Sequence, residues 1–321
     1  MKILLTTTSF QDTPGAHHEL LARSGFEVIR ERGPLSEEQM LDLVYKHHGF
    51  DAFLNGDDRI SARVIDAAGP RLRVIAKYGI GLDSIDVAYA TEKRIPVLFT
   101  PGVNHTTVAE HTFGLMIALA KDFWGHASAV KNGRWVRRTG HELMGKTLGV
   151  LGLGRIGQEV VKRANAFGMR CVAFSRHWPQ EFAREFGVVR VACAEDLLPL
   201  ADVVSLHMNL NDANRGFIDA RTLAMMKKGA YLINTARGGL VVENDVVEAC
   251  RTGHLAGYAT DVVDEEPMKT GHPFQSVDSI LVTPHIGSRT FESVERQALR
   301  AVTNLVEYLS GGKDYIQANP F

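Results

Sequence analysis

The chain has little cysteine, no excess of charge and no long apolar run, and each shortage excludes a class of protein. Its 321 residues include three cysteines, Cys171, Cys193 and Cys250, without metal-like spacing, so we expect free thiols, no bound metal and a cytoplasmic location. A formal net charge of −1 favours neither nucleic acid nor an anionic membrane as a partner. No apolar run reaches the roughly 18 residues of a membrane span. The first run turns polar at Thr6, too soon for a signal peptide.

The first hundred residues alternate short apolar runs with amphipathic segments. Strands are predicted over residues 3–6, 26–29, 52–54, 72–76 and 96–99, and helices over 16–24, 36–48 and 61–68. This alternation is typical of a parallel sheet with helices on both faces. Four histidines, His17, His18, His47 and His48, lie on polar stretches of the predicted helices, and we assign them no function.

A second α/β unit follows a long apolar helix predicted over residues 108–120. Its strands are expected over residues 148–151, 171–174, 203–207, 231–234, 257–260 and 280–282. A last helix over 290–309 has no strand after it, so we expect it to return to the first unit. The predicted fold is α/β with two doubly wound parallel sheets: a cofactor domain over residues 102–287, and a substrate domain built from residues 1–101 and 288–321.

The clearest motif lies at the start of the second unit, where Gly152, Gly154 and Gly157 form the pattern G-x-G-x-x-G. A strand-like run precedes it, and a helical pattern and a second strand complete a βαβ unit about 30 residues long. In such units the first glycine permits a tight turn, the second lets the backbone approach a pyrophosphate, and the third allows close helix packing. A ligand-free turn is the alternative, but the complete context favours dinucleotide binding.

Three later segments place polar side chains directly after strands, where open α/β sheets bind ligands. Arg237, followed by two glycines, can present its guanidinium to a carboxylate, or can merely cap a helix or pair with a surface acid. Glu266 lies in an acidic run in which Glu265 is expected to be solvated. His285 follows Pro284 at another strand end. If their loops meet, Glu266 can orient the imidazole of His285 and favour its protonated form, as suits a general acid.

Together these segments resemble the D-isomer-specific 2-hydroxyacid dehydrogenase family over nearly the whole chain. The similarity also includes three runs in or just after the first unit, Lys77-Tyr78-Gly79-Ile80-Gly81-Leu82-Asp83, Thr100-Pro101-Gly102-Val103-Asn104 and Thr107-Val108-Ala109-Glu110-His111. The resemblance implies a Rossmann cofactor domain and a flavodoxin-like substrate domain. It also implies hydride transfer between NAD(P)(H) and a small 2-oxo or 2-hydroxy acid.

The resemblance assigns a function to individual positions. It makes His285 the acid/base, Glu266 the carboxylate that orients it and raises its pKa, and Arg237 the group that binds the substrate carboxylate and carbonyl oxygen. It places the substrate carboxylate on the backbone at Gly79 and Ile80. The expected cofactor contacts are Gly152, Gly154, Arg155, Ile156, Gly157, Ser175, Arg176, His207, Thr235, Ala236, Asp261 and Gly287.

The end of the second strand of the βαβ unit bears on the choice of cofactor. NAD-binding units carry an acidic residue there, about 20 residues past the glycines, which binds the ribose hydroxyls. Here the positions are Ser175, Arg176 and His177. Because an acid that would repel the 2′-phosphate is absent and Arg176 can pair with it, we expect NADP to be preferred over NAD. The alternative is a solvated Arg176, with NAD held at its ribose by Ser175.

The substrate and the oligomeric state are further expectations. Acidic Asp57 and Asp58 lie where phosphoglycerate dehydrogenases carry a basic residue, so glyoxylate or hydroxypyruvate is favoured over 3-phosphoglycerate; Arg59, Arg137 or Arg138 could still bind a phosphate. Activity as a D-3-phosphoglycerate dehydrogenase, a phosphite- or formate-type oxidase, or an NAD(H)-sensing corepressor stays open.

The resemblance implies a homodimer that uses the predicted helix 108–120 and the segment through Trp135. This stretch is unusually apolar, with Phe113, Leu115, Met116, Phe123 and Trp124. The alternative is that the helix belongs to the core.

Overall fold

The computed structural model describes residues 1–321, and contacts divide them into two compact units. Unit 1 comprises Met1–Asn104 and Arg289–Phe321, and unit 2 comprises His105–Ser288. These divisions lie three residues and one residue beyond the predicted ones. None of the helices combines the length and the apolar character needed to cross a membrane.

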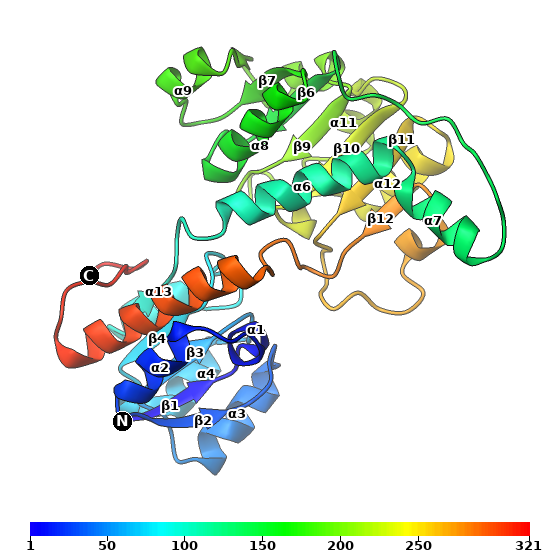
Figure 1. The fold of residues 1–321 in the computed structure, drawn as a ribbon. Coiled ribbons are helices and arrows are strands. Elements are labelled where there is room, and N and C mark those ends of the chain that lie inside the picture. The colour runs from blue at the N-terminus through cyan, green and yellow to red at the C-terminus, as the bar shows by residue number, and fades with distance from the viewer. The chain divides into compact units, whose positions relative to one another are not determined.

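Unit 1 is a five-stranded parallel sheet in the order β2-β1-β3-β4-β5, which is the flavodoxin-like order. The strands are β1 (Lys2–Leu5), β2 (Glu27–Arg30), β3 (Ala52–Asn55), β4 (Val74–Lys77) and β5 (Val97–Leu98). The helices are α1 (Thr8–Asp12), α2 (Ala16–Arg23), α3 (Glu37–Lys46), α4 (Ala62–Ala68), α5 (Val87–Glu92) and α13 (Phe291–Ser310). All residues of β3 and β4 are buried because helices cover both faces of the sheet (Figure 1).

The C-terminal helix α13 completes unit 1, as the sequence predicts. It packs against α2 and against the strands β3, β4 and β5. The tail that follows is tied to the sheet edge, where Asn319 Oδ1 accepts the backbone N–H of Val97 at 2.7 Å. Residues from both ends of the chain therefore share one core, which includes Ile3, Leu54 and Leu305.

Unit 2 is a seven-stranded parallel sheet in the order β12-β11-β10-β9-β6-β7-β8. The strands are β6 (Thr147–Leu151), β7 (Arg170–Phe174), β8 (Val189–Arg190), β9 (Val203–Leu206), β10 (Ala230–Asn234), β11 (Leu255–Thr260) and β12 (Ile280–Val282). The helices are α6 (His105–Ala120), α7 (Phe123–Lys131), α8 (Arg155–Ala166), α9 (Gln180–Glu185), α10 (Ala194–Leu197), α11 (Ala220–Met225) and α12 (Glu243–Arg251). The order reverses between β6 and β9, which is the crevice where Rossmann sheets bind dinucleotides.

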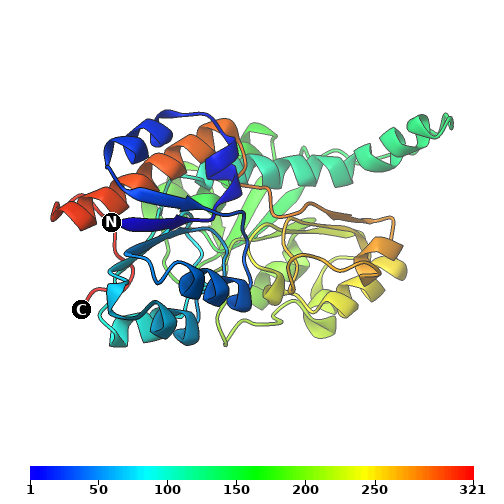
Figure 2. The same ribbon diagram turned by 90° about the horizontal axis from the view of Figure 1, so that it is seen from below.

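Helix α6 is a core helix of unit 2, apolar on most of its surface. Phe113, Leu115 and Met116 are buried, and the helix packs against α8, β10 and β11. These three residues therefore stabilise the unit and are not available to a partner. The following helix α7 extends beyond the sheet of its own unit (Figure 2).

Candidate active site

The glycine turn between β6 and α8 has the geometry that its sequence predicts. Gly152 has φ 105°, in the left-handed region that favours glycine, and a side chain there would meet the backbone of His207. A side chain at Gly157 would overlap the carbonyl oxygen of Gly152. The first glycine is thus required by the tight turn, and the third by the close approach of the helix to that turn.

The N-terminus of α8 is arranged to accept a phosphate. Its N-cap residue Gly154 supplies no capping side chain, and a Cβ placed there would have no protein atom within 4 Å. The first turn of the helix therefore lacks a side-chain cap, its N–H groups are available to an anion, and the helix dipole favours an anion there. These residues fit a dinucleotide pyrophosphate.

The end of β7 carries Ser175 and Arg176, the residues expected to choose the cofactor. Ser175 Oγ donates to the carbonyl oxygen of His177 at 2.9 Å, and the side chain of Arg176 is exposed. His207, at the end of β9, shares a 2.8 Å hydrogen bond with Ser205 Oγ. Burial lowers the pKa of His207 to about 4, so it is neutral at physiological pH.

Asn234 shapes the loop that carries Arg237, a role the sequence analysis did not identify. Its buried Oδ1 accepts the N–H of Ala236 at 3.0 Å, and its Nδ2 donates to the carbonyl of Arg237 at 2.9 Å. A side chain at the next residue, Gly238, would overlap the backbone of Val263. The Arg237 loop therefore packs directly on the loop that leads to Glu266, because Gly238 has no side chain.

His285 and Glu266 meet, as expected from their positions after two neighbouring strands. Nδ1 of His285 lies 2.7 Å from Oε2 of Glu266, while Oε1 accepts the N–H of Val263 at 3.3 Å. Since a carboxylate only accepts, Nδ1 carries the hydrogen and Nε2 is the nitrogen that can exchange a proton with a ligand. The side chain of His285 is 43% exposed, and its φ of 53° holds it in the left-handed region.

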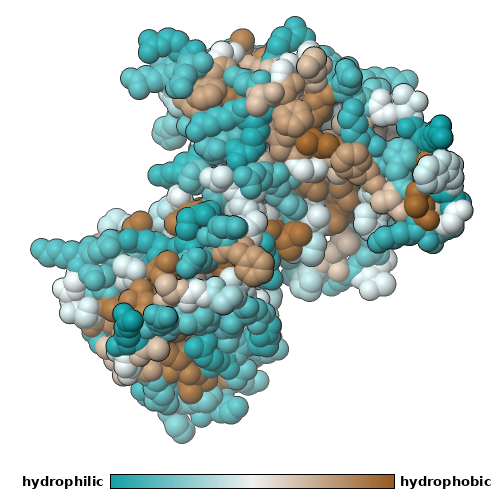
Figure 3. Space-filling model, in the orientation of Figure 1, coloured by the Kyte–Doolittle hydropathy of each residue, from teal (hydrophilic) through white to brown (hydrophobic).

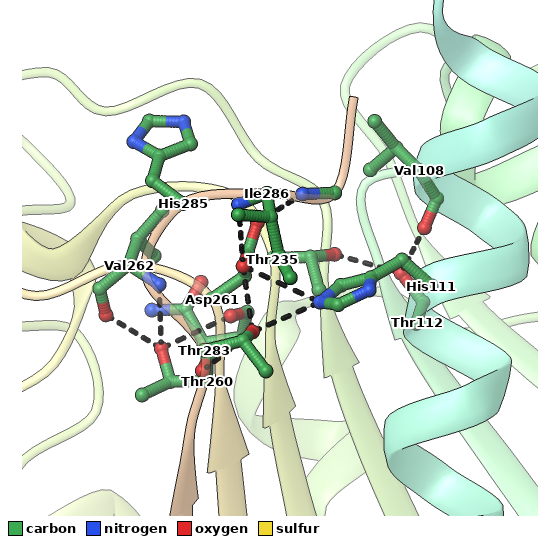
Figure 4. Close-up of polar contacts among 12 residues, drawn as sticks. Val108, His111, Thr112, Thr235, Thr260, Asp261, Val262, Thr283, His285 and Ile286 are labelled. Carbon is green, nitrogen blue, oxygen red and sulfur yellow. Dashed lines mark hydrogen bonds and ion pairs between the residues drawn. The ribbon is translucent and has the colours of Figure 1, made fainter. Parts of the chain in front are cut away.

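Asp261 fixes the backbone of the His285 loop (Figure 4). Its carbonyl accepts the N–H of His285 at 2.9 Å, and its carboxylate accepts those of Ile286 at 2.9 Å and Gly287 at 2.7 Å. Burial opposes the charged carboxylate, but hydrogen bonds, the first of them from His111, outweigh it and hold the pKa of Asp261 below its ordinary value. Both carboxylate oxygens of Asp261 already accept hydrogen bonds from the protein. A contact between Asp261 and a nicotinamide carboxamide stays a prediction.

The expected substrate loop lies in unit 1. The N–H of Gly79 donates to Thr100 Oγ1 at 3.1 Å. Of the two N–H groups predicted to bind the substrate carboxylate, that of Ile80 is therefore the one still available. Lys77, only 2% exposed, places Nζ 2.6 Å from Asp57 Oδ1 and 2.6 Å from the carbonyl oxygen of Gly56. A buried cation therefore lies at the carboxyl ends of this sheet.

Asp58 is not the phosphate-repelling group that the sequence suggested. It is fully buried and accepts the hydroxyl of Thr6 and the N–H groups of Leu35 at 2.8 Å and Gly56 at 3.0 Å. Its carboxylate therefore holds three loops together. Of the two acids, only Asp57 is exposed, and it is paired with Lys77.

Comparison with known proteins identifies the family of this chain. The profile of the D-isomer specific 2-hydroxyacid dehydrogenase NAD binding domain matches residues 113–287. A glyoxylate reductase of Aeropyrum pernix is 40% identical over 263 residues, which cover 79% of this chain and 78% of the relative. The chain belongs to the D-isomer specific 2-hydroxyacid dehydrogenase family. Unit 2 is thus its NAD(P)-binding domain, and the chain is an NAD(P)-dependent 2-hydroxyacid dehydrogenase.

Two further relatives extend the comparison. A D-3-phosphoglycerate dehydrogenase of Methanocaldococcus jannaschii is 40% identical over 255 residues, 79% of this chain, and the chain spans about half (48%) of that relative. The crystal structure of the TT0316 protein from Thermus thermophilus superposes with a TM-score of 0.88 at 38% identity, covering 99% of this chain and 100% of the other. The predicted α/β fold with two parallel sheets is confirmed.

Proposed function

We propose that this dehydrogenase reduces a small 2-oxo acid, glyoxylate or hydroxypyruvate, with His285 as the acid/base and NADPH as the preferred reductant. The observation that carries the proposal is the 2.7 Å contact between His285 Nδ1 and Glu266 Oε2. It orients Nε2 outward and favours the protonated ring, which a general acid requires.

The cofactor and three side chains have distinct tasks in the proposed reaction. The bound cofactor supplies the hydride. Protonated His285 gives its Nε2 proton to the carbonyl oxygen of the substrate, and Glu266 stabilises the imidazolium before transfer. Arg237, always cationic, binds the substrate carboxylate and stabilises the developing alkoxide. In the reverse direction neutral His285 accepts the proton, so low pH favours reduction.

The preference for NADP rests on the end of β7. Arg176 is exposed there, no acid occupies positions 175–177, and a guanidinium can pair with a 2′-phosphate dianion and stack on adenine. NAD binding, with its ribose held by Ser175, is the alternative.

The substrate preference is supported by the similarity to glyoxylate reductases, which extends over most of both chains. The argument from acidic residues is weaker than the sequence indicated, because Asp58 is engaged inside unit 1. Oxidation of 3-phosphoglycerate is therefore the second candidate, favoured by the buried cation of Lys77 and by the phosphoglycerate dehydrogenase relatives.

The deciding experiment is a panel of substrates with both cofactors. We expect the highest kcat/KM for glyoxylate or hydroxypyruvate with NADPH. Efficient oxidation of 3-phosphoglycerate would favour the second candidate. No turnover of any 2-oxo acid together with tight NADH binding would indicate a sensor rather than an enzyme.

We also propose a homodimer formed through α7 and the segment up to Trp135. Trp124 is 69% exposed and Trp135 79% exposed, and apolar side chains gather among polar ones at the position of α7 (Figure 3). Exposed aromatic residues of this size commonly mark an interface. The three free cysteines fit a cytoplasmic protein.

A further inference from the structure

His111 reaches from α6 to the base of the loop that carries His285. Its Nε2 lies 2.9 Å from Thr283 Oγ1 and 3.3 Å from Asp261 Oδ1, and Thr283 Oγ1 is 2.6 Å from the same Asp261 oxygen. The carboxylate accepts only, so the Thr283 hydroxyl donates to it and must accept from His111. The hydrogen of His111 therefore lies on Nε2.

The ring of His111 also limits where the loop can lie. A side chain at Gly287 would come within 3.4 Å of His111 Cδ2 and 2.9 Å of Asp261 Oδ2. The glycine backbone thus lies against both groups, two residues after His285. In Figure 4 the His111 side chain points at Asp261 and Thr283, whereas the His285 ring points away from them. His111 contacts the support of the loop and not the His285 ring.

Helix α6 is a rigid base for this contact because much of it is buried in the core of unit 2. The adjacent Thr112 Oγ1 lies 2.8 Å from Thr235 Oγ1, in the loop before Arg237. Besides Asp261, two acids of the surrounding segments are paired: Glu110, next to His111 in the chain, pairs with Arg163 at 3.1 Å, and Glu266 pairs with His285 at 2.7 Å. His111 and Thr112, two successive residues of α6, therefore contact the loops that lead to His285 and Arg237.

We propose that His111 is a positioning residue for the proton transfer, acting through Thr283 and Asp261 to hold His285 against Glu266. The proposal rests on the role assigned to His285. Without the Nε2–H, Thr283 and Asp261 lose their shared donor, and the loop shifts relative to Glu266. Displacements of about 1 Å in a reacting group cost up to roughly a hundredfold in rate.

The test compares His111→Phe, which keeps the ring but removes the donor, with His111→Gln, which keeps a donor near the Nε2 position. For His111→Phe we expect kcat for 2-oxo acid reduction to fall at least about tenfold. The alkaline limb of its pH profile should move to lower pH, because a weaker contact with Glu266 favours the imidazolium less. His111→Gln should keep kcat within about threefold of the parent and keep its pH profile. His47→Gln, which changes a histidine of unit 1, is the matched control.

Three outcomes would overturn the proposal about His111, and a fourth would refute the function on which it rests. A parental rate and pH profile in His111→Phe would overturn the proposal. A lower rate would also overturn it if the melting temperature fell in parallel and the pH profile did not change, because such a result indicates only a loss of structure. If His111→Phe does not fold, Thr283→Val against Thr283→Ser tests the same relay, and equal rates would overturn it. Activity retained in His285→Ala would instead refute the proposed function itself.

Discussion

Oε2 of Glu266 lies 2.7 Å from Nδ1 of His285, although 18 residues separate them along the chain. The two residues follow different strands, β11 and β12, which are neighbours in the sheet of unit 2. The parallel pairing of these strands brings both loops to one edge. The contact occupies Nδ1 of His285, so Nε2 is the nitrogen that gives the proton in the proposed reaction.

Removal of His285 is the direct test of the proton donor. His285→Ala should lower the rate of 2-oxo acid reduction at least about a hundredfold, as expected for lost general acid catalysis. Glu266→Gln should keep the ring near its place and move the alkaline limb of the pH profile to lower pH, because the imidazolium loses its counter-charge. Glu265→Gln is the control, since that acid pairs with Lys269 at 2.6 Å. Near-parental rates in His285→Ala would remove it from the mechanism.

The Arg237 guanidinium should be irreplaceable by another cation. Arg237→Lys retains charge but lacks the planar fork that binds a carboxylate through two hydrogen bonds. We therefore expect both a higher KM and a lower kcat for the 2-oxo acid, with the affinity for cofactor nearly unchanged. Steady-state kinetics measure KM and kcat, and cofactor fluorescence measures the affinity for the cofactor separately. Arg251→Lys, whose Nη2 contacts Ser276 Oγ at 2.9 Å, is the control.

Arg176 should set the choice between the two cofactors. Arg176→Ala should lower kcat/KM for NADPH at least about tenfold and change that for NADH little, since only the former loses a charge-assisted contact. The exposed Arg184 of α9 offers a matched control, Arg184→Ala. The prediction fails if the parent enzyme prefers NADH, or if Arg176→Ala does not change the ratio of kcat/KM for NADPH to kcat/KM for NADH.

His17 should make the free energy of unfolding depend on pH. His17 is fully buried, although it lies on a polar stretch of its helix. Its Nε2 donates to the Phe10 carbonyl at 3.0 Å, and its Nδ1 has no partner. Burial lowers its pKa in the folded state. The unfolded chain, with a pKa near 6.5, therefore binds a proton that the folded chain does not, and stability falls as pH drops below that value.

Urea denaturation at pH 7.5 and pH 5.5 measures this dependence. In His17→Gln, which retains a donor, the loss of stability between the two pH values should be smaller than in the parent. His47→Gln, on a partly exposed side chain, should leave the dependence unchanged. An identical pH dependence in His17→Gln and the parent would contradict the assignment.

The exposed tryptophans should govern the oligomeric state. We expect the parent mass by light scattering to be twice that of one chain, and Trp124→Glu or Trp135→Glu to reduce it to one, because a buried unpaired charge opposes association. Tyr45→Glu changes an equally exposed aromatic residue of unit 1, 65% accessible, and should leave the dimer intact. A parent of single-chain mass at micromolar concentration refutes the dimer.

The sequence by itself determined those features that depend on local patterns. Alternating apolar runs specified two α/β units, because strands and helices have different periods. The spacing of Gly152, Gly154 and Gly157 specified a phosphate-binding turn, because each glycine is required by its own backbone surroundings. The positions of Arg237, Glu266 and His285 after strands placed them on one sheet edge, because all strands of that sheet are parallel.

The tertiary structure alone decided what distant side chains do to one another. The sequence suggested that Asp58 disfavours a phosphorylated substrate, and it gave His17 and His111 no function. Packing buried the first two, and a helix beginning at residue 105 brought His111 against a loop near residue 285. The physical reason is that hydrogen-bond partners far apart in sequence are chosen by how whole elements pack, so burial and charge pairing cannot be read from neighbouring residues.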